Sequence, residues 1–140
     1  MSFDLSTIIA QGSFYVATHA GNTGSFQFRL SNDARFFWTL IIPEQPNIVE
    51  LHDMTSESAM ELFSLARTCG AHLQNELGAT KINSASIGNI VPQLHYHVVA
   101  RFEDDAAWPG PVWGHKAAEP SSEALMMMRT DILKTFLATL

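Results

Sequence analysis

The most informative stretch of this sequence is residues 93–99, which run Gln-Leu-His-Tyr-His-Val-Val. Apolar and aromatic residues continue beyond it, so we predict a strand from Leu94 to Phe102. Because side chains alternate along a strand, Gln93, His95 and His97 should project from one face. Burying imidazoles there without partners would cost free energy, so we expect this face to line a pocket or a dedicated hydrogen-bond network.

The spacing of the two histidines leaves three interpretations open. They can simply occupy an exposed sheet face, or they can bind zinc or iron, since His-x-His on a strand is a common ligand pair. They can also supply a nucleophilic imidazole held in a fixed tautomer. No obvious carboxylate or third histidine stands at ligand spacing, so a metal-binding protein is a less favoured alternative. We expect no metal and no cofactor.

The chain has 140 residues, of which 46% are hydrophobic and 16% charged. This length and composition predict a single domain over residues 1–140 with a substantial core. The net charge of −6 argues against nucleic acid or an anionic membrane as a partner, because neither is attracted by an acidic surface. A small phosphorylated ligand remains compatible, since it needs only a few convergent donors.

Three sequence features bear on location. The N-terminal residues lack the basic start and apolar run of a signal peptide, and no stretch approaches the ~20 apolar residues that span a bilayer. The single cysteine, Cys69, cannot form an internal disulfide, which is compatible with a reducing compartment. We therefore expect a cytoplasmic protein.

Hydrophobic periodicity and turn residues predict the remaining elements. Strands are expected at residues 13–19, 25–31, 36–42 and 81–86, and helices at 4–11, 56–77 and from Ser121 or Ser122 to about Leu137. Asp4 should cap the first helix, and Thr55 and Gly78 should bound the second. The pattern predicts an α+β fold, with a mostly antiparallel five-stranded sheet, one long helix and one C-terminal helix.

The helical periodicity also predicts which side chains pack on the sheet. The buried stripe of the long helix is expected to be Met60, Phe63, Ala66, Leu73 and Leu77. That of the C-terminal helix is expected to be Leu125, Met128, Ile132 and Phe136. The methionine run at residues 126–128 is interpreted as core filling or dimer surface.

Residues 93–99, followed by Arg101, resemble the His-φ-His-φ-His-φ-φ signature of the histidine triad family, in which φ is apolar. Upstream, Lys81-Ile-Asn83 and Gly88-Asn89 resemble the family's asparagine strand and the turn before the triad. Residues 30–33, the apolar run into Pro43 and residues 51–54 resemble its early strands and helix entrance. The resemblance covers roughly residues 25–102 and points to the diadenosine polyphosphate hydrolase-like members.

The resemblance implies a HIT-like fold, usually a homodimer in which two sheets join, and a two-step displacement at the α-phosphorus of a purine nucleotide derivative. Diadenosine polyphosphates and adenosine phosphoramidates are the implied substrates. His95 would attack and form a nucleotidyl-histidine, oriented by the backbone carbonyl of Gln93, and water or an acceptor would resolve it. The other implied roles are phosphate contacts from His97 and Asn89, pocket orientation by Asn83 and ribose binding by Asn32.

The sequence departs from the family pattern at three places. The first triad position is Gln93, which can donate and accept hydrogen bonds but cannot titrate. Ile90 stands where many members carry Ser or Thr, and residues 32–43 are short and lack the histidine before the apolar run. Gln93 can lower the activity or redirect it to another leaving group. The alternative function is a nucleotide-binding module whose catalysis is impaired by Gln93.

Other residues are candidates for partial compensation. Ser84 or Ser86 can replace the missing hydroxyl, and His115 can fold back to replace the lost imidazole. Trp108 and Trp113 can shape a base pocket by stacking, or can instead pack the C-terminal segment.

Overall fold

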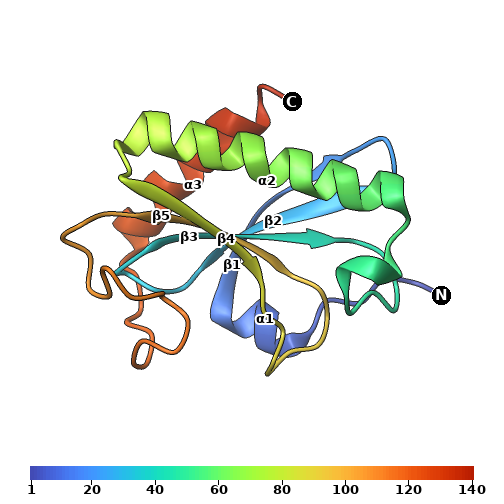
Figure 1. The fold of residues 1–140 in the computed structure, drawn as a ribbon, viewed down its shortest axis with the longest axis horizontal. Helices are drawn as coiled ribbons and strands as arrows, with labels where there is room; N and C mark the ends of the chain where they lie inside the picture. Colours follow the sequence, from blue (N-terminus) through green and yellow to red (C-terminus); the bar gives the residue numbers. More distant parts are fainter.

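The computed structural model describes residues 1–140 and contains one five-stranded sheet with helices on both faces (Figure 1). The strands are β1 (Ser13–Ala20), β2 (Ser25–Ser31), β3 (Phe37–Pro43), β4 (Lys81–Ser86) and β5 (Tyr96–Arg101). They lie in the order β1-β2-β3-β5-β4, and every neighbouring pair is antiparallel. The helices are α1 (Thr7–Gly12), α2 (Ser56–Leu77) and α3 (Glu123–Leu137), with a 3-10 helix, η1 (Leu51–Asp53), before α2. The predicted α+β architecture is confirmed.

The long helix α2 has the predicted bounds because both of its ends are capped. The Thr55 hydroxyl accepts the backbone N–H of Ser58 at 3.2 Å, and Gly78 takes the left-handed conformation with φ of 67°. At the start of α3 the Ser122 hydroxyl accepts the backbone N–H of Leu125 at 3.2 Å.

None of the helices combines the length and the apolar character that a membrane span requires.

The predicted buried stripe of α2 was partly wrong. The side chains of Met60 and Phe63 are 70% and 44% exposed. The residues that α2 buries are Ser58, Leu62, Leu65, Ala66, Cys69, Gly70 and Leu73. Small residues let the helix approach the sheet closely, since a Cβ added at Gly70 would lie 3.1 Å from the Ile82 side chain. The contact with the sheet is therefore centred on small residues, which a search for large apolar side chains passes over.

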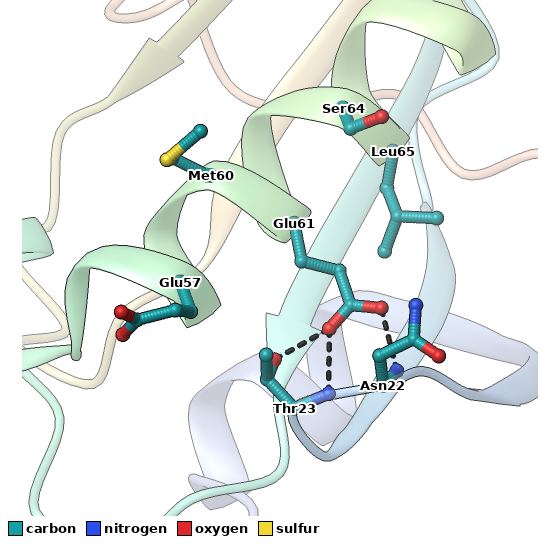
Figure 2. A pocket seen from close by; sticks show the side chains of 7 residues that line it. All are labelled: Asn22, Thr23, Glu57, Met60, Glu61, Ser64 and Leu65. Atoms are coloured by element: carbon teal, nitrogen blue, oxygen red, sulfur yellow. Dashed lines mark hydrogen bonds between the residues drawn. The ribbon is translucent and has the colours of Figure 1, made fainter.

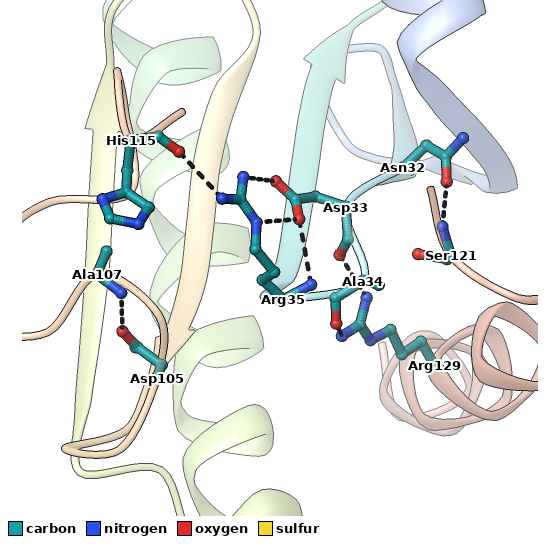
Figure 3. Close-up of polar contacts among 9 residues, drawn as sticks. All are labelled: Asn32, Asp33, Ala34, Arg35, Asp105, Ala107, His115, Ser121 and Arg129. Atoms are coloured by element: carbon teal, nitrogen blue, oxygen red, sulfur yellow. Dashed lines mark hydrogen bonds and ion pairs between the residues drawn. The ribbon is translucent and has the colours of Figure 1, made fainter. Parts of the chain in front are cut away.

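The predicted stripe of α3 was displaced by one residue along most of its length. The buried residues are Met126, Arg129, Leu133 and Phe136, whereas Met127 and Met128 are exposed. Arg129 is buried because its guanidinium donates to the backbone carbonyls of Asp33 and Ala34 at 2.8 and 2.9 Å (Figure 3). A charged residue at the centre of the packed face hides the periodicity from sequence.

The first helix is shorter than predicted and is not capped by Asp4. It begins at Thr7, and Asp4 lies outside it in a segment without regular structure. The backbone around this segment bonds instead to Gln93, which is far away in the sequence. A distant partner therefore determines where α1 begins.

The two faces of the sheet carry different side chains. Figure 1 shows α2 and α3 over one face and α1 below the other. The face under α2 and α3 is apolar, with a core that includes Phe26, Phe28, Leu30, Ile41, Val98 and Ala100. The opposite face presents alternating polar residues, including Gln27 and Arg29 of β2 and His97 and Arg101 of β5. Arg29 joins α1 to the sheet through the Ser13 hydroxyl at 2.7 Å and the backbone carbonyl of Ala10 at 3.4 Å.

The β1–β2 hairpin is fastened to α2 by one carboxylate. Figure 2 shows Glu61 of α2 accepting the backbone N–H groups of Asn22 and Thr23, at 2.7 and 2.8 Å, and the Thr23 hydroxyl. These bonds lower the pKa of Glu61 although burial opposes the shift. The hollow beside this carboxylate is explained by hairpin packing and lies apart from the two histidines of β5.

Candidate active site

The two histidines border a cavity between α1 and the polar face of the sheet. Its volume is about 170 Å³, and its walls are Ile8, Ile9, Gly12, Ser31, Trp38, Leu40, Val91, His95 and His97. The rings of His95 and His97 lie with centroids 4.8 Å apart in an edge-to-face arrangement. β5 begins at Tyr96, two residues later than predicted, so His95 lies just before the paired strand.

His95 is held by the backbone. Its Nδ1 lies 2.7 Å from the carbonyl oxygen of Gln93. A carbonyl only accepts hydrogen bonds, so Nδ1 carries the proton and donates it. The lone pair of the neutral ring is therefore on Nε2, as a nucleophile requires.

His97 is held by a side chain of the neighbouring strand. In the β3–β5 ladder Leu40 is opposite His97, which makes Trp38 its diagonal neighbour on the same face. The Trp38 indole N–H donates to Nδ1 of His97 at 2.8 Å. Burial, reinforced by the charge of neighbouring His95, lowers the pKa of His97 to about 3. His97 is therefore neutral at physiological pH.

The second ring nitrogen of His97 has no partner in the protein. His97 is only 5% exposed, and its Nε2 is buried without a hydrogen bond. An unsatisfied buried donor costs about 1–3 kcal/mol, which an acceptor entering the cavity would recover. Nε2 is thus suited to donate to an oxygen of a bound ligand.

Trp113 covers the His97–Trp38 pair. Its ring packs edge-on against both, with centroid distances of 5.4 Å to His97 and 5.9 Å to Trp38. The loop that carries Trp113 is held by Arg101, which donates to the Asp105 carboxylate at 2.7 Å and to the Gly110 carbonyl at 2.8 Å. Trp113 therefore belongs to the apolar surroundings of His97, and its own indole N–H has no hydrogen-bond partner.

Gln93 does not line the cavity. Its amide oxygen accepts the backbone N–H of Ser6 at 2.8 Å, and its amide nitrogen donates to the carbonyl of Asp4 at 2.8 Å. Both contacts hold the segment that leads into α1, and α1 in turn supplies Ile8 and Ile9 to the cavity wall. The side chain at the first triad position therefore fastens the N-terminal segment, while its backbone carbonyl orients His95.

Comparison with known proteins places this chain in a family. A model of the HIT domain matches residues 22–104. The chain belongs to the histidine triad family. A search of curated protein sequences finds no significant match.

Solved histidine triad structures agree over nearly the whole chain. A histidine triad protein from Sinorhizobium meliloti 1021 is 34% identical, with a TM-score of 0.88 over 95% of this chain and 96% of its own. One from Marinobacter aquaeolei VT8 is 28% identical, with a TM-score of 0.91 over 100% and 99%. One from Bradyrhizobium japonicum is 26% identical, with a TM-score of 0.89 over 98% and 99%. Members of the histidine triad family commonly bind, hydrolyse or transfer nucleotides.

The three asparagines that the family resemblance singled out lie outside the wall of this histidine triad cavity. The Asn83 side-chain oxygen accepts from Arg101 at 2.7 Å. The Asn32 oxygen accepts the backbone N–H of Ser121 at 2.9 Å, which joins this loop to the start of α3 (Figure 3). Asn89 is exposed and its side chain makes no hydrogen bond. Their ligand contacts remain predictions.

The candidates for compensation also lie away from the cavity wall. The His115 backbone carbonyl accepts from Arg35 at 3.2 Å, and its ring makes no hydrogen bond. The Trp108 ring packs against the Arg101 guanidinium, whose Cζ lies 5.6 Å from the ring centroid. Neither serine of β4 borders the cavity, and Ile90 is exposed. No group of three or more His, Cys, Asp or Glu side chains is placed to hold a metal ion.

Sequence reasoning missed the residues that complete the cavity. Ser31 comes from β2, Trp38 from β3, and Ile8 and Ile9 from α1. The one available signal was Trp38, a side chain able to donate a hydrogen bond within an otherwise apolar strand, where a buried indole N–H requires an acceptor.

Proposed function

We propose that this histidine triad protein is a nucleotide hydrolase or nucleotidyl transferase that acts on the α-phosphate of a purine nucleotide derivative through a nucleotidyl-histidine at His95. The observation that carries the proposal is the 2.7 Å contact from Nδ1 of His95 to the Gln93 carbonyl. It keeps the lone pair on Nε2 in a ring that borders a cavity.

In the first step the Nε2 lone pair of His95 attacks the α-phosphorus, and the bond to the leaving group breaks with its electron pair. The imidazolium that forms keeps its Nδ1–H on the Gln93 carbonyl, so its positive charge is stabilised by a fixed acceptor. Nε2–H of His97 donates to a phosphoryl oxygen on which charge develops. Water or another acceptor then attacks phosphorus, the P–N bond breaks with its electron pair returning to Nε2 of His95, and the proton of the attacking hydroxyl is released to solvent.

The proposed substrates are diadenosine polyphosphates and adenosine phosphoramidates, which are small molecules compatible with an acidic protein. Catalysis uses imidazole and hydrogen-bond donors and needs no metal in this scheme. We propose that three asparagines contact the nucleotide: Asn32, Asn83 and Asn89. Their amide N–H groups make no hydrogen bond within the protein. The loops that carry Asn32 and Asn89 can also move toward a bound nucleotide. His97 and Gln93 support the nucleophile.

A nucleotide-binding module with impaired catalysis is the alternative. It is favoured by Gln93, because an amide does not titrate and this one holds the N-terminal segment through Ser6 and Asp4 instead of lining the cavity. Tight binding with no turnover would distinguish this alternative from the enzyme.

We further propose that the chain acts as one domain and forms a homodimer. α1, α2 and α3 pack on one sheet, and the two edge strands, β1 and β4, each have one side unpaired within the chain. A cytoplasmic location is proposed on the ground of the single buried thiol of Cys69. Light scattering over a range of concentrations tests the dimer, which a constant monomer mass would exclude.

The experiment is incubation with diadenosine tetraphosphate or an adenosine phosphoramidate in the presence of a chelator, followed by mass spectrometry of the quenched protein. An adenylyl group on His95 and release of AMP are expected. His95→Ala should lose both, whereas His52→Ala, which alters an exposed histidine of η1, should retain both. Activity that vanishes with the chelator and returns with zinc would contradict the metal-free mechanism.

A further inference from the structure

The hydrogen bond between Trp38 and His97 decides the protonation pattern of His97. An indole N–H can only donate, so Nδ1 of His97 must present its lone pair to Trp38. The proton of the neutral ring is therefore on Nε2, the buried atom that has no partner within the protein. His95 has the opposite tautomer, with its proton on Nδ1.

We propose that Trp38 is a positioning residue that holds His97 as a fixed Nε2–H donor, so that the site has no general acid and takes nucleotide derivatives whose leaving group departs as a stable anion. This inference rests on the proposed function and names its substrate class.

His97 can act as an acid only after it gains a second proton. That proton would have to go to Nδ1, which accepts from Trp38, and the bond would be lost inside a buried cluster. The groups around His97 do not favour a positive charge, because Trp38 and Leu40 of β3, Ala85 of β4 and Trp113 are all uncharged. The one titratable neighbour is His95, whose imidazolium would repel it.

The remaining cavity wall supplies no other acid. Apart from the two imidazoles it consists of aliphatic residues, Gly12, the Trp38 indole and the Ser31 hydroxyl, none of which titrates near neutral pH. Gln93 at the first triad position cannot titrate, and its amide is already bonded to the N-terminal segment. A leaving group therefore receives no proton from a side chain of this cavity.

The lack of a general acid determines which leaving groups can depart in the first step. When His95 attacks, the bond from phosphorus to the leaving atom breaks and the leaving group takes both electrons. A phosphate, carboxylate or nitrophenolate carries that pair as a stable anion. An amine leaves only if its nitrogen is protonated, because the alternative is a strongly basic amide anion. The geometry therefore favours anhydrides, including dinucleoside polyphosphates, over phosphoramidates.

The tautomer is tested directly by long-range ¹H–¹⁵N correlation spectra of protein labelled at histidine. His97 is expected to be the Nε2–H tautomer and to show no titration between pH 5 and pH 9. Trp38→Phe should remove the donor, and His97 should then populate the other tautomer or titrate at a higher pH. Trp113→Phe is the matched control, since Trp113 packs on the same ring but bonds to nothing through its N–H.

The leaving-group rule is tested with AMP aryl esters of graded phenol pKa and with adenosine N-alkylphosphoramidates, which share one nucleotidyl group. We expect kcat/KM to fall steeply as the phenol pKa rises, and the phosphoramidates to be slower by about 100-fold or more, the contribution that a general acid normally makes. A shallow dependence, or amines released as fast as nitrophenolate, would overturn the rule.

The histidine spectra and the ester kinetics distinguish a failure of the proposed function from a failure of the role given to Trp38. If no ester is turned over, the proposed function and the leaving-group rule both fall, and the spectra alone decide the role of Trp38. An Nδ1–H tautomer in the unmodified protein, or a Trp38→Phe spectrum equal to that of Trp113→Phe, would overturn that role.

Discussion

The face of the sheet beneath α2 and α3 is filled by apolar side chains that contact one another. One such pair is Phe28 of β2 and Phe136 of α3, whose ring centroids lie 6.1 Å apart. The opposite face holds His95 and His97 through single hydrogen bonds to the Gln93 carbonyl and to Trp38. On the first face many weak packing contacts each contribute a little to the free energy of unfolding. On the second face a single hydrogen bond determines which ring nitrogen of each histidine carries the proton. Substitutions on the two faces should therefore separate stability from activity.

The largest effect is expected from His95→Ala. Removing the nucleophile should lower kcat/KM by at least about 1000-fold, because nothing else in the cavity can form the covalent intermediate. The ring is only partly buried, so the free energy of unfolding should change by less than about 1 kcal/mol. Steady-state kinetics and urea unfolding of the same preparation measure both quantities.

Phe28→Ala should have the reverse profile. Phe28 is fully buried, and truncating such a ring lowers the free energy of unfolding by about 3–5 kcal/mol. Below the unfolding transition, kcat/KM per folded molecule should be nearly unchanged, since Phe28 points away from the histidine face. A loss of activity in the folded variant comparable to that of His95→Ala would contradict the separation of the two faces.

Asp105 gives the polar face a pH-dependent contribution. Burial opposes ionisation, but hydrogen bonds from Arg101 and from the backbone of Phe102, Ala107 and Trp108 lower its pKa to about 2. In the unfolded chain the pKa of Asp105 is higher, so the ionised carboxylate stabilises the folded protein. This contribution to the free energy of unfolding is about 2 kcal/mol above pH 4, and it is lost as the pH falls from about 4 to 2. Urea unfolding across that range should show this loss, and Asp105→Asn should flatten it.

The smallest effect is expected from Gln93→Leu. Losing two hydrogen bonds to the N-terminal segment should lower the free energy of unfolding by about 1–2 kcal/mol and increase hydrogen exchange at Ser6. The backbone carbonyl at residue 93 remains, so adenylylation of His95 should persist. If the adduct disappears in a folded Gln93→Leu protein, the side chain does more than fasten this segment.

The same contrast explains what was predictable from sequence. α2, β2 and β4 were predicted with their observed bounds because caps, turns and alternation are local signals. The resemblance to the histidine triad led to His95, to His97 and to the Gln93 backbone carbonyl that orients His95. The bond from Trp38 to His97 joins residues 59 apart, and the Gln93 contacts join residues 87 and 89 apart. No local pattern encodes such pairs, which is why the start of α1 and the cavity wall were missed.

The stereochemical course at phosphorus tests the covalent route through His95 most directly. An AMP anhydride made chiral at the α-phosphorus with sulfur and an oxygen isotope is hydrolysed in isotopically labelled water, and the configuration of the product is determined. Two successive in-line displacements, one by His95 and one by water, predict net retention. Net inversion would show a single direct attack by water and would contradict the nucleotidyl-histidine.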